Sequence, residues 1–174
     1  MARNCRVNYS ELDEFRKKVK SNLGSAQVDL FIESCAKELA ARLLAKVVKR
    51  TPVGDYSGDP HSCVTPNGTI YHKGSKVQGK KGGTLRRGWT AGKNQAASAY
   101  AGNLKVNHYG GVYVIEIVNP VEYASYVEFG HRKRGGEGWT EGHFMLTVSE
   151  QEIQAAAPKI LEAKLKKKLG EIFK

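Results

Sequence analysis

The amino-acid sequence predicts an α+β domain, in which an antiparallel β-meander of three to four strands packs against N-terminal and C-terminal helices, with a long polar loop. Apolar residues recur at helical spacing over residues 10–50 and again over 144–173. Short stretches rich in β-branched and aromatic residues follow one another over 84–119, and a glycine-rich polar stretch fills 53–83. Because 174 residues are enough for one hydrophobic core and few for two, we expect a single domain over residues 1–174.

Two helices are expected within residues 10–50. The first begins at Ser10, a suitable N-cap, and ends at Gly24. Its apolar positions, at helical spacing, are Leu12, Phe15, Val19 and Leu23. The second runs from about residue 26 to residue 50 and has a broad apolar stripe. Thr51-Pro52 ends it, because the residue before a proline is disfavoured in the α conformation.

Residues 53–83 are dominated by glycine, proline, aspartate, serine and lysine, as in GDYSGDPHSC and KGSKVQGKKGG. Such a stretch offers few large apolar side chains to hold it against a core. It therefore predicts a long, mobile loop.

Three stretches of the middle region predict the strands of the meander: TLRRGWTAG, NLKVNHY and VYVIEIVN. The last two are joined at Gly110-Gly111, a pair suited to the positive φ angles of a tight hairpin turn. Alternation along the last strand predicts one buried face and one outward face. The buried face is Tyr113, Ile115 and Ile117, and the outward face is Val112, Val114 and Glu116.

Two more helices complete the prediction. A short helix over residues 120–130 has Asn119 as its N-cap and Pro120 as its first residue. Gly130 is expected to end it in the left-handed conformation. The final helix, over residues 144–173, is expected to start with a capping box of Ser149 and Glu152.

The composition restricts the partners and the compartment. The chain has 28 Lys and Arg residues against 17 Asp and Glu residues, a formal net charge of +11, which favours contact with phosphates or with an acidic protein surface. No apolar run is long enough for a signal peptide or a membrane span, so we expect a soluble protein that is not secreted. Cys5, Cys35 and Cys63 are widely spaced and suit a reducing environment, with Cys35 packed on a helix face.

One group of residues could bind a metal. His61, Cys63 and His72 offer imidazole and thiolate ligands, but their spacing matches no zinc motif and a fourth ligand is not evident. We therefore expect ordinary loop residues here and no metal. A small metal-dependent enzyme is kept as a third hypothesis, which metal analysis would test.

Catalytic motifs are also missing. His131 and His143 could be imagined as an acid/base pair, but no nucleophile stands in a recognisable elbow. The GSKVQGKKGG stretch fails as a phosphate-binding loop, because Lys81 stands where serine or threonine is required. The sequence predicts no catalytic residue and no cofactor, and the protein is expected not to be an enzyme.

Basic clusters recur along the chain and could contact nucleic-acid phosphates. The candidate phosphate contacts are Lys80, Lys81, Arg86, Arg87, Lys133 and Arg134. Tyr71, Trp89 and Trp139 could stack on bases. A solvated basic face explains the clusters better, because neither a DNA-reading helix nor a standard RNA-binding signature accompanies them.

The aromatic and apolar residues around residues 120–146 need a surface to pack on, because a helix of about ten residues is marginal by itself in water. They either pack on the chain's own sheet or, in part, on a neighbouring subunit, since aromatic residues are enriched at interfaces. The sequence does not divide them between the two.

Four short motifs follow one another in the chain: Thr51-Pro52-Val53, GTLRRGW at residues 83–89, YASYVEFG at residues 123–130, and Phe144-Met145-Leu146. Taken in this order, they resemble the motifs of the small tail-component, or neck and tail-completion, proteins of tailed bacteriophages. YASYVEFG is the most specific of them. Two features depart from the family pattern: the polar loop separates the first two motifs, and His143 stands where a proline often precedes the phenylalanine.

The resemblance implies a structural protein of a virion or phage-tail-like particle, assembled in the cytoplasm of the host bacterium. It implies a ring adapter, homo-hexameric, between the head connector and the tail terminator, with DNA able to pass through its channel. The alternative is a basic DNA-binding module of phage origin. The candidate subunit or ring interface is Leu85, Arg86, Trp89, Tyr123, Tyr126, Glu128, Phe129, Gly130, His131, Arg132, Phe144 and Met145.

Overall fold

The computed structural model describes residues 21, 24–56, 60–65, 68–73, 81–92, 95–109 and 112–172. Within these residues the chain combines helices with short antiparallel strands, which confirms a broadly α+β protein. The first predicted helix, from Ser10 to Gly24, lies almost entirely outside the described residues.

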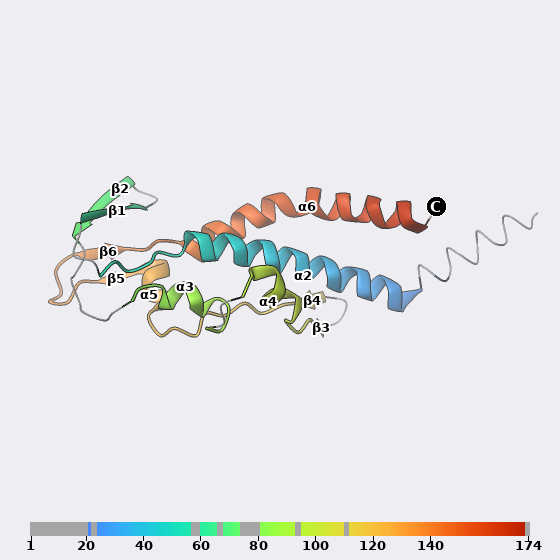
Figure 1. Ribbon diagram of the computed structural model, residues 1–174, viewed down its shortest axis with the longest axis horizontal. Helices are drawn as coiled ribbons and strands as arrows, with labels where there is room; N and C mark the ends of the chain where they lie inside the picture. The colour runs from blue at the N-terminus through green and yellow to red at the C-terminus, as the bar shows by residue number, and fades with distance from the viewer. Residues whose placement is uncertain are drawn as a thin grey trace, which may run out of the picture.

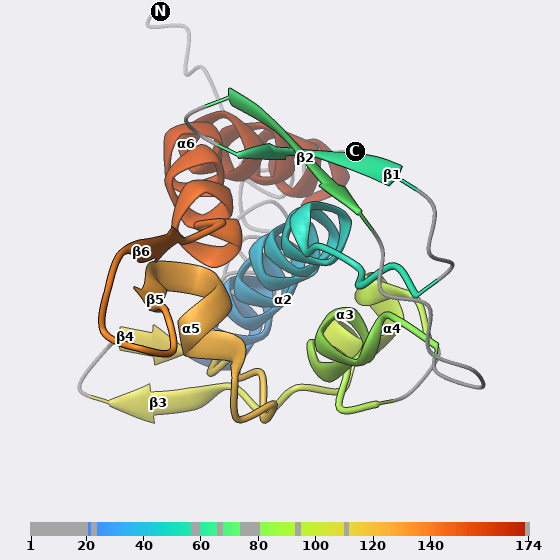
Figure 2. The same cartoon turned by 90° about the vertical axis from the view of Figure 1, so that its left-hand side faces the viewer.

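Two long helices run side by side and antiparallel along the long axis of the molecule (Figure 1). They are α2 (Ser25–Arg50) and α6 (Met145–Ile172). Viewed along this axis, α2 lies in the centre, with α6 on one side of it (Figure 2). The short helices α3 (Thr84–Gly88) and α4 (Ala97–Gly102) lie on the other side, and α5 (Ala124–Phe129) lies beside α2 next to the start of α6. A helix covered on two sides needs apolar residues over a wide arc, and the broad stripe of α2 meets this need.

The core lies where α2 contacts α3, α4 and the start of α6. Leu44 and Val47 of α2 are fully enclosed. Around them pack the buried residues Ala40, Leu85, Trp89, Ala101 and Met145. Burial of large apolar side chains contributes about 1.5–3 kcal/mol each, so this cluster is the main source of stability among the described residues.

The strands form three separate two-stranded antiparallel sheets. They are β1 (Pro60–Thr65) with β2 (Gly68–Lys73), β3 (Asn107–Tyr109) with β4 (Val112–Val114), and β5 (Gly130–Arg132) with β6 (Trp139–Glu141). The described residues therefore do not form the predicted continuous meander of three to four strands. The predicted loop over 53–83 contains the β1–β2 hairpin, a pairing that its polar composition concealed.

The predicted strand TLRRGWTAG is wrong, because residues 84–88 form helix α3. A strand would place Leu85, Arg87 and Trp89 on one face and so bury a charge. A helical turn instead places Leu85 and Trp89 four residues apart on the same face, where both are buried in the core, while Arg87 is exposed. Burial of the apolar pair therefore favours the helix.

The hairpin predicted across residues 103–119 is confirmed over a shorter length. Strand β3 begins at Asn107, and the residues up to Gly102 belong to helix α4, which was not predicted from the sequence. The turn at Gly110-Gly111 lies outside the described residues. Beyond β4 the predicted alternation holds: Ile115 and Ile117 pack against the core, while Glu116 is exposed.

Both late helices begin elsewhere than predicted. Helix α5 begins at Ala124 instead of residue 120. The Asn119 side chain still makes a cap-like bond, because its Oδ1 accepts from the Val121 N–H at 3.2 Å, while its amide donates to the Leu85 carbonyl at 2.9 Å. Helix α6 begins at Met145, so Ser149 lies inside it and cannot be its N-cap. The Ser149 hydroxyl instead donates to the Met145 carbonyl at 2.6 Å.

Candidate interaction surface

Glu128, the glutamate of YASYVEFG, is a buried carboxylate at the start of α6. It accepts hydrogen bonds from the backbone N–H groups of Leu146 at 2.9 Å and Thr147 at 2.8 Å. The Thr147 hydroxyl donates a third bond at 2.7 Å. The first N–H groups of a helix have no partner within it, and a negative charge there is favourable. Glu128 therefore caps α6 from the neighbouring helix α5, in the role that the sequence assigned to Ser149.

Gly130 follows on the same motif and is buried. Its φ of +83° agrees with the positive φ expected from the sequence, but its ψ of 174° is extended and not left-handed helical. A Cβ at this position would lie 2.4 Å from the Thr140 carbonyl oxygen and 2.7 Å from the Trp139 indole nitrogen. Glycine is required because strand β6 passes directly over the backbone.

The first two motifs meet at Thr51, just after the end of α2. The indole N–H of Trp89 donates to the Thr51 hydroxyl at 2.8 Å, and this hydroxyl donates to the Val47 carbonyl at 2.7 Å. The Arg86 guanidinium donates twice to the Thr51 carbonyl, at 3.2 and 2.7 Å. Thr51-Pro52-Val53 and GTLRRGW, far apart in sequence, therefore form one hydrogen-bonded joint.

Several residues of the predicted subunit interface take part in contacts within the chain. Leu85, Trp89, Glu128, Gly130 and Met145 are buried within the chain, so their side chains or backbone support the fold. Arg86 is half-buried, and its guanidinium is hydrogen-bonded to the Thr51 carbonyl. Phe144 is also half-buried and has a positive φ just before the start of α6. These residues pack within the chain or bond to it.

The other predicted interface residues are exposed together at one end of the molecule. Tyr123, Tyr126 and Phe129 have exposed fractions of 45, 59 and 61%. The Tyr126 ring makes an edge contact with the His131 ring, with centroids 5.8 Å apart. Trp139, on β6, is 56% exposed and is paired with the exposed Arg132 across the hairpin.

We call Tyr123, Tyr126, Phe129 and Trp139 the aromatic surface. Trp139 was predicted from the sequence only as a residue that could stack on bases, and it is not among the predicted interface residues. The sequence around Trp139 gives little indication of an exposed interface residue, because a single tryptophan between a glycine and a threonine belongs to no periodic pattern.

A groove of about 750 Å³ lies beside the aromatic surface. Tyr123, Tyr126 and His131 line it together with Pro52 and Val53. The remaining lining residues are Gly54, Tyr56, Lys81, Gly82, Gly83, Thr84, Leu85, Val127, Thr140, Glu141 and His143. A concave surface with a mixture of aromatic and polar residues is suited to a protein segment more than to a small charged ligand.

The candidate phosphate contacts are not gathered in one place. Lys133 and Arg134 are exposed next to Arg132 in the turn of the β5–β6 hairpin. Arg87 and Lys81 are exposed near the start of α3, whereas Arg86 points into the Thr51 joint. Lys80 lies outside the described residues. Among these candidates, Lys133 and Arg134 therefore stand with Arg132 as three consecutive exposed cations.

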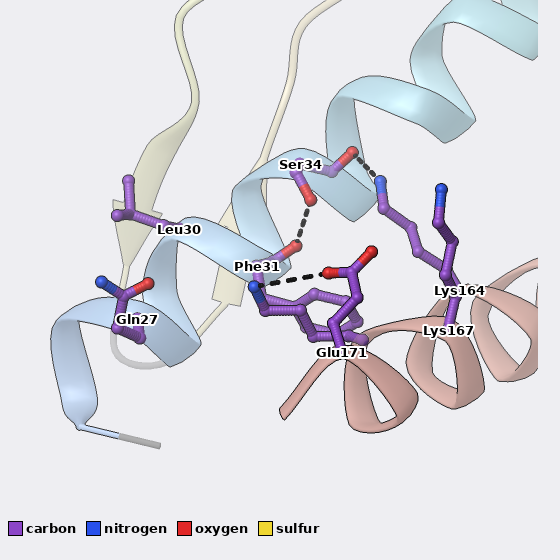
Figure 3. Close-up of a pocket in the computed structure, with 8 residues that line it drawn as sticks. Gln27, Leu30, Phe31, Ser34, Lys164, Lys167 and Glu171 are labelled. Carbon is purple, nitrogen blue, oxygen red and sulfur yellow. Dashed lines mark hydrogen bonds and ion pairs between the residues drawn. The ribbon is translucent and has the colours of Figure 1, made fainter. Parts of the chain in front are cut away.

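A smaller hollow of about 270 Å³ lies between the start of α2 and the end of α6 (Figure 3). Lys164 lies across it and donates to the Ser34 carbonyl at 2.7 Å, and its ammonium is 3.0 Å from a carboxylate oxygen of Glu38. Arg42 and Lys164, as hydrogen-bond donors, hold the pKa of Glu38 below its ordinary value. This hollow is a gap between two packed helices, and the Lys164 ammonium that crosses it is already paired with Glu38.

Metal-binding clusters are not seen in the described part of the chain, and the two histidines considered as an acid/base pair are placed differently from each other. No group of three or more His, Cys, Asp or Glu residues could hold a metal there. His131 is exposed at the aromatic surface, and the His143 backbone N–H donates to the Val127 carbonyl at 2.8 Å. The side chains of His61, Cys63 and His72 lie outside what the structure describes. Among the described helices, none is both long and apolar enough to cross a membrane.

Residues 13–130, more than half of the chain, match the model of one protein family, HK97-gp10-like, described as "Bacteriophage HK97-gp10, putative tail-component". No curated protein and no solved structure shows a significant match. The matched residues include three of the four motifs, together with the Thr51 joint and the capping carboxylate Glu128. The chain therefore belongs to the HK97-gp10-like family of bacteriophage tail components.

Proposed function

We propose that this protein is a structural adapter of the neck or tail-completion type, a homo-oligomeric ring between the head connector and the tail terminator. The observation behind the proposal is the aromatic surface. In a family of tail components, the motif residues of this chain divide into a buried set that builds the fold and an exposed set that is free to dock.

Exposed aromatic side chains in a cluster are typical of protein–protein interfaces. Tyr126 and Phe129 lie three residues apart on α5 and are both more than half exposed. Neither side chain belongs to the buried core, which includes Leu85, Trp89 and Met145. A surface of this kind is expected to be covered in the assembled particle.

The shape of the subunit is also suited to a ring. A closed ring of identical subunits requires two different surfaces on each subunit, one of which meets the other on the next copy. The described elements extend along one axis, with β5–β6 at one end and the start of α2 and end of α6 at the other (Figure 1). Two unlike surfaces are therefore present on one chain.

The partners proposed are further copies of the chain, a homo-hexamer as the family resemblance implies, with a head connector or stopper on one side and a tail terminator or other tail protein on the other. DNA would pass through the ring, no membrane is involved, and assembly takes place in the cytoplasm of the host bacterium. The proposal assigns no chemical step and no cofactor.

Particle assembly in cells tests the proposal. A genome in which this gene is disrupted is expected to yield unjoined heads and tails, visible by electron microscopy. Addition of the purified protein to the lysate is expected to restore joined particles. Normal yields of complete particles without the protein would contradict an adapter role.

The alternative function, a basic DNA-binding module, has one supporting observation. Arg132, Lys133 and Arg134 are exposed consecutively, with Trp139 close by for stacking. Duplex DNA affinity measured at several salt concentrations tests it: several phosphate contacts predict a steep fall with log salt. A shallow dependence with weak binding would remove this alternative.

A further inference from the structure

The charges of this strongly basic chain are unevenly placed. No lysine or arginine lies between Lys105 and Arg132, although the chain has 28 of these residues. Within this stretch Glu116 and Glu122 are exposed, and neither is in an ion pair with another described residue. Immediately after it come three exposed cations in a row.

The acidic stretch includes a segment with the character of a sheet edge. After β4 the chain shows the alternating burial of a strand as far as Glu122. The backbone groups of residues 116–118 make no hydrogen bond to any described residue. On the outward side, Val118 is 65% exposed beside Glu116. We call residues 115–122 the open edge. Its unpaired backbone groups are those of residues 116–118, because Pro120 has no N–H and Val121 bonds to the Asn119 side chain and the Ala124 N–H. Unpaired N–H and C=O groups of this kind are a template for pairing with another chain.

The β5–β6 hairpin has the complementary character. Gly130 is buried, but all of the hairpin residues from 131 to 141 are exposed. A hairpin of two short strands is marginal alone, but its base is anchored. The N–H groups of His143 and Phe144 donate to the carbonyls of Val127 and Glu128, at 2.8 and 3.0 Å. These bonds fix the end of the hairpin to helix α5, while the rest of the hairpin extends into solvent.

The open edge begins away from the hairpin and runs back towards it. Figure 1 shows β5–β6 at one end of the long axis and β4, where the open edge begins, well along it towards the other end, while α5, which follows the edge, lies beside β5. Figure 2, viewed from the hairpin end, shows β4 behind β5 and β6. A hairpin and an edge on one chain therefore meet the requirement for head-to-tail association.

We propose that the basic β5–β6 hairpin of one copy docks on the open edge of the next copy. Arg132 and Arg134 face Glu116 and Glu122, and Trp139 covers Val118. This inference rests on the proposed function, because it names the contact that closes the ring. Complementary charge selects the correct surfaces and speeds their encounter, while the apolar contact and the backbone pairing provide affinity.

Charge reversal tests this contact. One variant has Arg132→Glu with Arg134→Glu, and the other has Glu116→Lys with Glu122→Lys. All four side chains are exposed, so both variants are expected to fold normally by circular dichroism and thermal melting. By sedimentation velocity, each variant alone is expected to self-associate at least about tenfold more weakly than the wild type.

The decisive sample is an equimolar mixture of the two variants. Each reversed hairpin then meets a reversed edge, and each native hairpin meets a native edge, so alternating assembly is expected to return. Lys49→Glu with Lys159→Glu is a matched control, because it reverses two exposed cations on the long helices. This control is expected to associate like the wild type.

The other outcomes overturn the inference in distinguishable ways. A wild-type oligomer that neither variant weakens would place the contact elsewhere and leave the adapter function standing. A hairpin variant that loses duplex DNA binding but still self-associates would assign the hairpin to DNA. A wild-type chain that stays monomeric at every concentration would overturn the contact, while the particle experiment judges the adapter function separately.

Discussion

At the scale of single residues, the motif YASYVEFG has two uses. Glu128 and Gly130 face inward, where one caps a helix and the other allows a strand to cross its backbone. Tyr123, Tyr126 and Phe129 face outward. A motif that reads as one unit in the sequence is divided between folding and docking, because a short helix has two faces.

The cap formed by Glu128 predicts a stability change. Glu128→Gln keeps the shape but removes the negative charge that three donors share. Hydrogen bonds to charged groups contribute about 1.5–3 kcal/mol, so we expect a loss of about 1–3 kcal/mol in the free energy of unfolding, measured by urea denaturation. Glu150→Gln, an exposed change on the same helix, is the control and should cost under about 0.5 kcal/mol.

Substitution of Gly130 and Gly135 by alanine distinguishes the free-energy cost of backbone strain from that of a steric clash. Both have positive φ, at +83° and +110°, but a Cβ at Gly135 would meet nothing within 4 Å. Gly135→Ala should therefore cost only the backbone strain, about 1–2 kcal/mol. Gly130→Ala adds a clash with the Thr140 carbonyl oxygen and should cost about 3 kcal/mol or more. Equal melting temperatures for the two variants would show that the close approach of β6 is unimportant.

At the scale of elements, the joint at Thr51 connects α2 to α3, and a layer of charged residues connects α2 to α6. Arg50 donates to Ser149 at 2.6 Å and to Glu152 at 2.8 Å, and Lys46 donates to Glu152 at 2.6 Å. The central position of α2 explains both connections. It is the helix that both neighbouring layers must contact.

Thr51 and Trp89 are expected to be energetically coupled. Thr51→Val leaves the buried indole N–H of Trp89 without its acceptor, at a cost of about 1–3 kcal/mol. Trp89→Phe removes the donor as well as part of the core contact. In the double variant the two losses should be less than additive by about 1 kcal/mol. Strict additivity in urea denaturation would show that this hydrogen bond contributes nothing.

The charged layer predicts a dependence of stability on pH. Hydrogen bonds from Lys46 and then Arg50 hold the pKa of Glu152 below its ordinary value. A lowered pKa in the folded state means that the stabilisation is present above the unfolded pKa and is lost as pH falls through the folded pKa. Thermal melts between about pH 6 and pH 3 should therefore fall more steeply for the wild type than for Glu152→Gln. Parallel curves would contradict this assignment.

At the scale of the whole molecule, stability and assembly should be separable. Tyr126→Ser with Phe129→Ser changes side chains that are 59 and 61% exposed, so the melting temperature should move by only a few degrees. Joining of heads to tails should fail, because interface aromatic residues commonly contribute more than about 2 kcal/mol each. Leu165→Ser, an exposed apolar change on α6 that is 46% exposed, is the matched control for both measurements.

Local sequence patterns were sufficient for the features that neighbouring residues control. The apolar stripe over residues 26–50 predicted α2, and the alternation after Val112 predicted which side faces the core. Gly130 was recognised as a position of positive φ. The ordered motifs also indicated the family, since each motif is a short contiguous stretch.

The three-dimensional arrangement decided the features that depend on distant residues. TLRRGW is a helix and not a strand because Leu85 and Trp89 find their burial against α2, more than thirty residues earlier in the chain. Glu128 replaced Ser149 as the cap of α6 because α5 ends against the start of that helix. Similarly, which aromatic residues remain exposed for docking follows from what the core has already covered, and burial of this kind is a property of contacts between distant segments, which no local pattern contains.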